Sequence, residues 1–81
     1  MIESIIPCIK VTQVNGMVSC DMYVEEGHEI KFITNQDEEI VGTFSFIELS
    51  QYEDYDDILH IRINEKDTRT FRVSEIKKIY N

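Results

Sequence analysis

The stretch at positions 48–57 carries the residues best suited to recognising a partner. It sets two tyrosines among acidic residues: Glu48, Tyr52, Glu53, Asp54, Tyr55, Asp56 and Asp57. Spaced carboxylates can imitate the phosphates of a nucleic acid, and aromatic rings beside them can stack against a partner. This pattern predicts docking on the basic groove of a nucleic-acid-binding protein. The alternative is a solvated loop that keeps the protein soluble, since charge runs are commonly exposed faces.

A basic set of residues follows the acidic stretch. If Ile61 pairs with Phe71, then His60, Arg62 and Arg72 share one outward face and form a strip able to bind an anion. The alternative is that the two arginines pair with acids of neighbouring strands, which contributes little energy at an exposed surface.

The spacing of the residues gives little support for a metal site or an enzyme active site. The acidic run lacks the central glycine and the terminal glutamate of an EF-hand calcium loop. Residues of zinc-binding type show neither CxxC nor HxxxH spacing: Cys8, Cys20, His28 and His60. There is also no glycine-rich phosphate loop and no nucleophile elbow. We therefore expect no metal, no cofactor, no catalytic residues and no disulfide.

Charge divides the chain into an acidic and a basic part. The formal net charge is −8, with −11 over residues 1–57 and +3 over residues 58–81. An acidic surface repels a phosphate backbone, so the composition favours a protein partner with a basic surface over direct nucleic-acid binding. The first residues lack the basic region of a signal peptide, and no apolar run is long enough to cross a membrane. We expect a cytoplasmic protein that does not contact membranes.

The elements that position these residues begin with a predicted hairpin over residues 8–24. Asn15-Gly16 is typical of a two-residue type I′ turn, which would pair Val11 with Cys20. In that register one face of the hairpin is apolar: Ile9, Val11, Val18, Cys20 and Met22.

Two long strands are predicted next, over residues 29–34 and 40–49. Gly42 marks a bend or a β-bulge, or the close approach of another backbone. Strict alternation puts Phe44 and Phe46 together on one side of the second strand. The outward positions of the two strands then carry a second apolar set: Ile33, Ile47 and Leu49. That set is predicted to be covered by the curvature of a barrel or by another copy of the chain.

The last part of the sequence predicts two shorter strands, over residues 58–63 and 69–73, then a 3₁₀ turn capped by Ser74 and a closing strand. The inward residues of the two shorter strands are predicted to be Leu59, Ile61, Ile63, Phe71 and Val73. Short strands without an interior helix are typical of a small barrel, because closure removes exposed sheet edges.

Segments 27–32, 41–44, 59–63 and 71–79 resemble the SH3-like and Sm-like small barrels, in which a bent strand follows a glycine and a 3₁₀ turn precedes the last strand. The RNA-binding loop signatures of Sm proteins are not recognisable, so RNA binding is not implied. The predicted fold is all-β, with one domain over residues 1–81 that comprises a hairpin at 8–24 and a body at 27–80. It is a single SH3-like barrel or a strongly bent antiparallel sheet of about six strands, with at most one short helical or 3₁₀ turn.

Three functions fit this sequence. The leading hypothesis is a non-enzymatic acidic interaction module, such as an inhibitor made by a phage or mobile element, that docks on a basic protein as a nucleic-acid mimic. The second is a homo-oligomeric structural or assembly protein that associates through Ile33, Ile47 or Leu49. The third is a weak nucleic-acid or anion binder that uses His60, Arg62 and Arg72.

Overall fold

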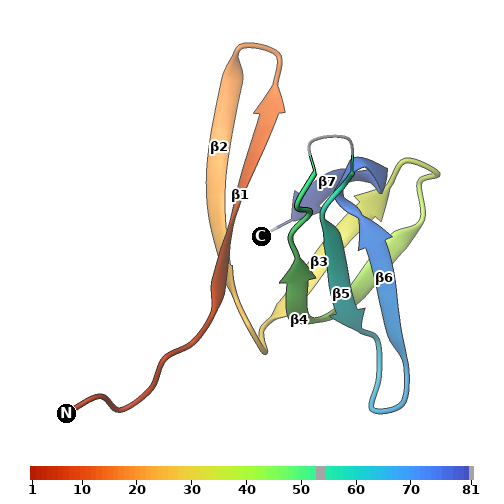
Figure 1. Ribbon diagram of the computed structural model, residues 1–81. Coiled ribbons are helices and arrows are strands. Elements are labelled where there is room, and N and C mark those ends of the chain that lie inside the picture. Colours follow the sequence, from red (N-terminus) through yellow and green to blue (C-terminus); the bar gives the residue numbers. More distant parts are fainter. Residues whose placement is uncertain (53–54, 81) are drawn as a thin grey trace.

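The computed structural model describes residues 1–52 and 55–80, and in them the chain forms seven β-strands and one 3₁₀ turn (Figure 1). The elements are β1 (Cys8–Asn15), β2 (Val18–Glu25), β3 (Glu29–Thr34), β4 (Glu39–Glu48), β5 (Ile58–Arg62), β6 (Thr68–Arg72), η1 (Val73–Glu75) and β7 (Ile76–Tyr80). β1 and β2 form a two-stranded sheet, and the other strands form an antiparallel sheet in the order β6-β5-β4-β3-β7. In Figure 1 the β1–β2 hairpin stands beside the larger sheet as an arm.

The larger sheet is bent and open rather than closed. Within the described residues β6 pairs only with β5 and β7 only with β3, so the sheet ends in two edges. The prediction of an all-β fold is confirmed, in the form of a bent antiparallel sheet and not a closed barrel. The same residues include no helix with the length and hydrophobicity needed to span a bilayer.

The hairpin turn differs from the one that Asn-Gly predicts. Asn15 pairs with Val18, so the turn residues are Gly16 and Met17. Gly16 has a φ of 65°, while Met17 is not among the residues with positive φ. This pattern is typical of a type II′ turn, which places glycine at its first central position, whereas type I′ needs positive φ at both.

The register of the hairpin is shifted, but the faces of its strands are as predicted. Val11 pairs with Met22 and not with Cys20. A shift of two residues returns each side chain to the same face, because side chains alternate with a period of two. Cys8, at the start of β1, and Cys20 are both exposed and free.

The core lies inside the bend of the five-stranded sheet. Phe32, Phe44 and Ile61 are almost completely covered, and Phe32 packs edge-to-face on Phe71 with ring centroids 5.0 Å apart. The other buried apolar residues of this cluster are Val24, Ile30, Ile40, Leu59 and Ile79. Burying one such side chain contributes about 1.5–3 kcal/mol, so this cluster is the main source of stability for the sheet.

Gly42 permits the close approach that the sequence predicts at this position. A Cβ atom there would collide with the side chain of Ile61 and would lie 2.8 Å from the carbonyl oxygen of Arg62. The contact to a backbone atom cannot be relieved by a rotamer change. A glycine is therefore needed where β5 lies against β4.

The β-bulge of β4 lies at Ser45 and not at Gly42, where the sequence suggested one, and it changes the direction of the side chains in the second half of the strand. The pairing of β4 with β5 shifts between Phe44 and Phe46, so Ser45 is the extra residue. Phe46 is consequently 48% exposed, and Ile47 packs against the core. The prediction that Phe46 shares a side with Phe44, and that Ile47 faces outward, is wrong because strict alternation ends at a bulge.

The later strands end one residue earlier than predicted. β5 ends at Arg62 and β6 at Arg72, so Ile63 and Val73 are exposed and do not point into the core as predicted. Ser74 lies inside η1 and does not cap it, since Arg72 occupies the cap position.

Gln13 joins the middle of the hairpin to the larger sheet by hydrogen bonds, beside Val11 and Met22, which pack against the core. Gln13 Nε2 donates a hydrogen bond to the carbonyl oxygen of Ile79, and the Ile79 N–H donates to Gln13 Oε1, both at 2.9 Å. The amide thus pairs with the edge of β7 much as a neighbouring strand would. The base of the hairpin is held by buried Val24 and by a bond of 2.9 Å from the Glu26 N–H to the Pro7 carbonyl.

Candidate interaction site

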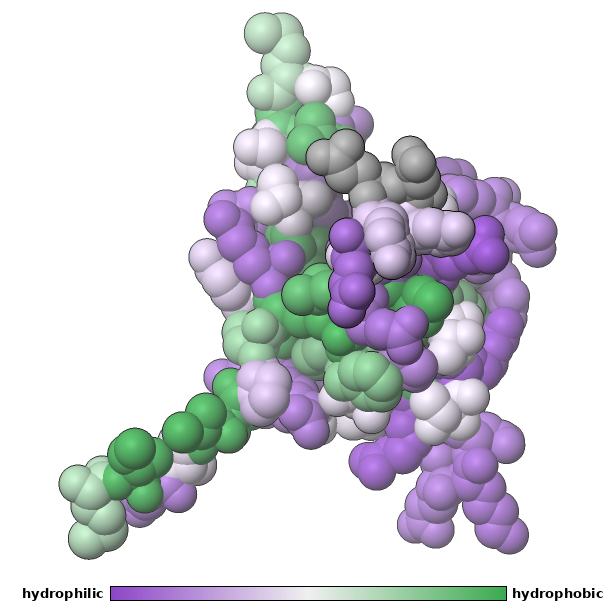
Figure 2. Space-filling model, viewed as in Figure 1, coloured by the Kyte–Doolittle hydropathy of each residue, from purple (hydrophilic) through white to green (hydrophobic). Residues whose placement is uncertain are grey.

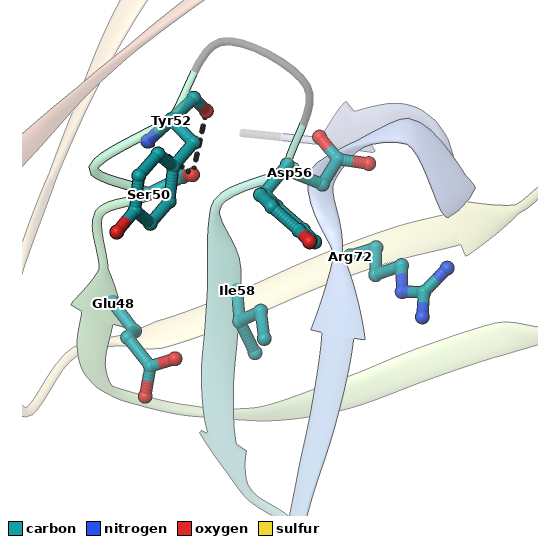
Figure 3. A pocket seen from close by; sticks show the side chains of 7 residues that line it. Glu48, Ser50, Tyr52, Asp56, Ile58 and Arg72 are labelled. Atoms are coloured by element: carbon teal, nitrogen blue, oxygen red, sulfur yellow. Dashed lines mark hydrogen bonds between the residues drawn. The ribbon is translucent and has the colours of Figure 1, made fainter.

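An open hollow of about 730 Å³ lies where the β4–β5 connection meets β6 (Figure 3). It is lined by Glu48, Ser50, Tyr52, Tyr55, Asp56, Ile58 and Arg72. Four of these residues belong to the predicted acidic and aromatic stretch, and Arg72 belongs to the predicted basic strip. Figure 3 shows Glu48 and Arg72 on opposite sides of the hollow, with Ile58 between them. Glu53 and Asp54, also predicted to contact the partner, lie outside the described residues.

The two tyrosines form an exposed aromatic pair. The rings of Tyr52 and Tyr55 meet edge to face with centroids 5.7 Å apart, and the residues are 68% and 70% exposed. Their backbone is folded by local bonds: Ser50 Oγ donates to the Tyr52 carbonyl at 2.8 Å, and the Tyr55 N–H donates to the same oxygen at 3.2 Å. The pair is therefore held above the sheet by its own turn.

The carboxylates of Asp56 and Asp57 face the fold. Asp57 Oδ1 accepts a hydrogen bond of 2.8 Å from the Ser50 N–H, which closes the base of the connection. Asp56 Oδ2 accepts a bond of 3.1 Å from the N–H of Ser74 in η1. The Val73 N–H donates to the Asp57 carbonyl at 3.0 Å. These two residues thus brace the tyrosine turn against η1, a role that the sequence did not predict.

The remaining acidic segments do not extend this surface. The carboxylates at 37–39 each form an ion pair, with Lys77 at 3.0 Å, Arg69 at 2.9 Å and Lys31 at 3.2 Å. The turn at 25–28 lies at the bottom of Figure 1, whereas the β4–β5 connection lies at the top. The acidic character of the hollow is therefore local.

The basic residues share a face without converging on one point. Leu59, and not Ile61, pairs with Phe71, so the predicted register is wrong by two residues. That shift preserves the common face but places Arg72 opposite Ile58 at one end of the β5–β6 pair. Arg62 lies opposite Thr68 at the other end, four residues and about 13 Å away. The register thus places the backbones of the two arginines at opposite ends of the strand pair, with His60 between them.

His60 is a packing residue in this arrangement. Its ring stacks on Phe46 with centroids 3.9 Å apart and an interplanar angle of 15°. Its Nε2 atom lies 3.8 Å from Glu48 Oε1 and is buried without a hydrogen-bond partner among the described residues. The stack depends on the β-bulge at Ser45, so strict alternation concealed it.

The three residues predicted to join copies of the chain do not share a surface. Ile33 is half-buried beside its neighbour Phe32, which points to the core, and so lies on the opposite side of β3. Ile47 packs against the core, and Leu49 is 69% exposed beyond the end of β4. Association through any one of them stays a prediction. No group of three His, Cys, Asp or Glu side chains suited to a metal occurs in residues 1–52 and 55–80.

No protein-family model, curated protein or solved structure matches this chain. The SH3-like and Sm-like resemblance therefore stays a prediction from the sequence pattern, and the function must be argued from the site.

Proposed function

We propose that this chain is a non-enzymatic interaction module that docks on a basic protein surface through Tyr52, Tyr55 and Glu48. The exposed tyrosine pair is the observation that carries the proposal. More than two thirds of each tyrosine is exposed, and hydrogen bonds join the backbones of the two tyrosines and tie Ser50 to Tyr52. Tyrosines are enriched among the residues that dominate binding energy at interfaces, because they bury a large area with few rotatable bonds.

Charge supports a basic partner. The chain carries a net charge of −8, and the Glu48 side chain at the rim of the hollow is 61% exposed. Complementary charge steers association and selects partners more than it adds affinity. The partner class proposed is a nucleic-acid-binding protein whose basic groove the module occupies in place of nucleic acid. An inhibitor made by a phage or mobile element would act in this way.

Asp56 and Asp57 have a different role in this proposal from the one predicted for them. Because their carboxylates accept backbone hydrogen bonds, they position the tyrosines and do not contact the partner. Changing them should weaken binding by loosening the turn, whereas changing Glu48 should weaken it by removing charge.

The test is binding by a tyrosine-deficient variant. The wild-type chain is used to capture its partner from a lysate of the native host, and the dissociation constant is then measured with the purified partner. Replacing Tyr52→Ala together with Tyr55→Ala should weaken binding at least about 100-fold, the loss typical of two dominant interface residues. Tyr23→Ala is the matched control, since Tyr23 is 67% exposed on the hairpin.

Two further results complete the test. A DNA oligonucleotide should displace the module from its partner, because both occupy the same basic surface. Equal affinity of the double variant and the wild-type chain would refute the proposed site, and binding unaffected by DNA would refute the nucleic-acid mimic.

A further inference from the structure

A second hollow, a groove of about 850 Å³, separates β1 from the larger sheet. Apolar side chains from both walls line it: Ile9, Val11, Ile47, Leu59, Ile76 and Ile79. In the described part of the chain β1 and β7 are not paired as strands, and Gln13 bridges them at Ile79 on one side of the groove. Figure 2 shows hydrophobic residues in the region between the hairpin and the body. An apolar groove of this kind is a place for another apolar segment.

Residues 1–6 carry four apolar side chains that the described part of the molecule leaves largely uncovered. Met1, Ile2, Ile5 and Ile6 are each at least 53% exposed. Figure 2 shows the segment as a hydrophobic extension that leaves the body at the lower left. In an extended chain Ile2, Ser4 and Ile6 point to one side, and Met1, Glu3 and Ile5 point to the other. Each side thus carries two apolar side chains around one polar residue, so the segment can contact apolar surface on both sides.

The segment is directed away from the groove of its own molecule. The Pro7 carbonyl is bonded to the Glu26 N–H at the base of the hairpin, and β1 runs from there along the groove. Proline also holds the preceding residue, Ile6, in an extended conformation. To enter its own groove the chain would have to reverse direction immediately before Pro7. The segment of another copy meets no such obstacle.

We propose that residues 1–6 of one copy bind in the groove of a second copy, and reciprocally, in a two-fold symmetric dimer. The lengths are compatible, since six extended residues span about 20 Å and the eight residues of β1 span about 26 Å. Charge adds little to the fit, because two of the lysines that line the groove already form ion pairs, Lys10 with Asp21 and Lys77 with Asp37. This proposal does not depend on the tyrosine site.

The area available is that of a stable dimer. Burying an apolar side chain of this size removes on the order of 60–120 Å² from water. Four such side chains from each of two segments, with the matching groove surfaces, would bury about 1,000–2,000 Å² in total, which overlaps the range of specific interfaces.

Sedimentation equilibrium of the full chain tests the dimer. We expect a dimer for the wild-type chain and a dissociation constant at least about 100-fold higher when Ile2, Ile5 and Ile6 are all replaced by Ser. The matched control carries Met17→Ser and Leu49→Ser, which remove exposed apolar side chains outside the groove, and should dimerise like the wild type. A wild-type chain that is monomeric at about 100 µM, or a triple variant that dimerises equally well, would overturn the proposal.

Alkylation of Cys20 locates the interface, because Cys20 is exposed and lines the groove. In a Cys8→Ser background the reaction should slow as the chain dimerises, and the triple serine substitution should restore the fast rate. If Cys20 reacts equally fast in monomer and dimer, the segment does not occupy the groove and the proposal fails.

Discussion

The five-stranded sheet and the N-terminal hairpin differ in how much of their own surface they bury. Every residue of the buried core cluster except Val24 comes from the sheet. Beyond Val24 the residues of the hairpin are half-buried or exposed. Because an isolated two-stranded hairpin is marginally stable in water, the sheet must supply the stability and the hairpin must depend on it.

The difference explains where the two proposed interfaces lie. The tyrosine turn is built on the stable sheet and braced by Asp56 and Asp57, so it can present a fixed surface to a partner. The groove lies between the sheet and the less buried hairpin, where apolar surface is left uncovered. The proposed tyrosine site thus lies on the sheet, and the proposed dimer site lies beside the hairpin, where apolar surface would be buried on association.

The largest effect is expected from Phe32→Ala in the core of the sheet. Phe32 is 0% exposed and packs on the ring of Phe71, so its truncation leaves a cavity. Such substitutions cost about 3–5 kcal/mol, a large part of the stability of a small domain. Urea denaturation followed by circular dichroism should show a much lower midpoint. A loss below about 1 kcal/mol would mean that the sheet does not depend on this core.

The sequence predicts much of the difference between the sheet and the hairpin. Alternation assigns a residue to the correct face of its strand even when the predicted pairing is shifted by two residues. The registers of β1–β2 and β5–β6 are both shifted by two residues, yet Val11 and Arg62 remain on their predicted faces. The bulge at Ser45 could not be predicted, since it depends on how β5 packs across β4. The bracing roles of Asp56 and Asp57 could not be predicted either. Asp56 meets Ser74, and Asp57 meets Ser50, only once the chain is folded.

A smaller and more local effect is expected from Gln13→Ala. This change removes both hydrogen bonds between the hairpin and β7, each worth about 0.5–1.5 kcal/mol. The hairpin should loosen while the sheet stays folded. The Ile79 N–H loses its acceptor, so its amide exchange should become at least about tenfold faster. This corresponds to a fall of about 1.4 kcal/mol in the free energy of local opening.

The control for Gln13→Ala is Thr12→Ala on the other face of the same strand. Thr12 Oγ1 donates to Asp21 Oδ1 at 2.7 Å within the hairpin, where the bond is exposed. Its loss should leave the exchange of Ile79 unchanged. Equal effects of the two substitutions would show that Gln13 has no special role in joining the hairpin to the sheet.

The central claim is that the five-stranded sheet stays folded when the hairpin opens. Native-state hydrogen exchange tests it most directly, with Ile2, Ile5 and Ile6 replaced by Ser to keep the chain monomeric. The hydrogen-bonded amides of β1 and β2 should exchange by local opening at least about 100-fold faster than those of Phe32, Phe44 and Ile61. Those three amides should open only on global unfolding. Equal protection of hairpin and sheet, with one common free energy of opening, would contradict the account.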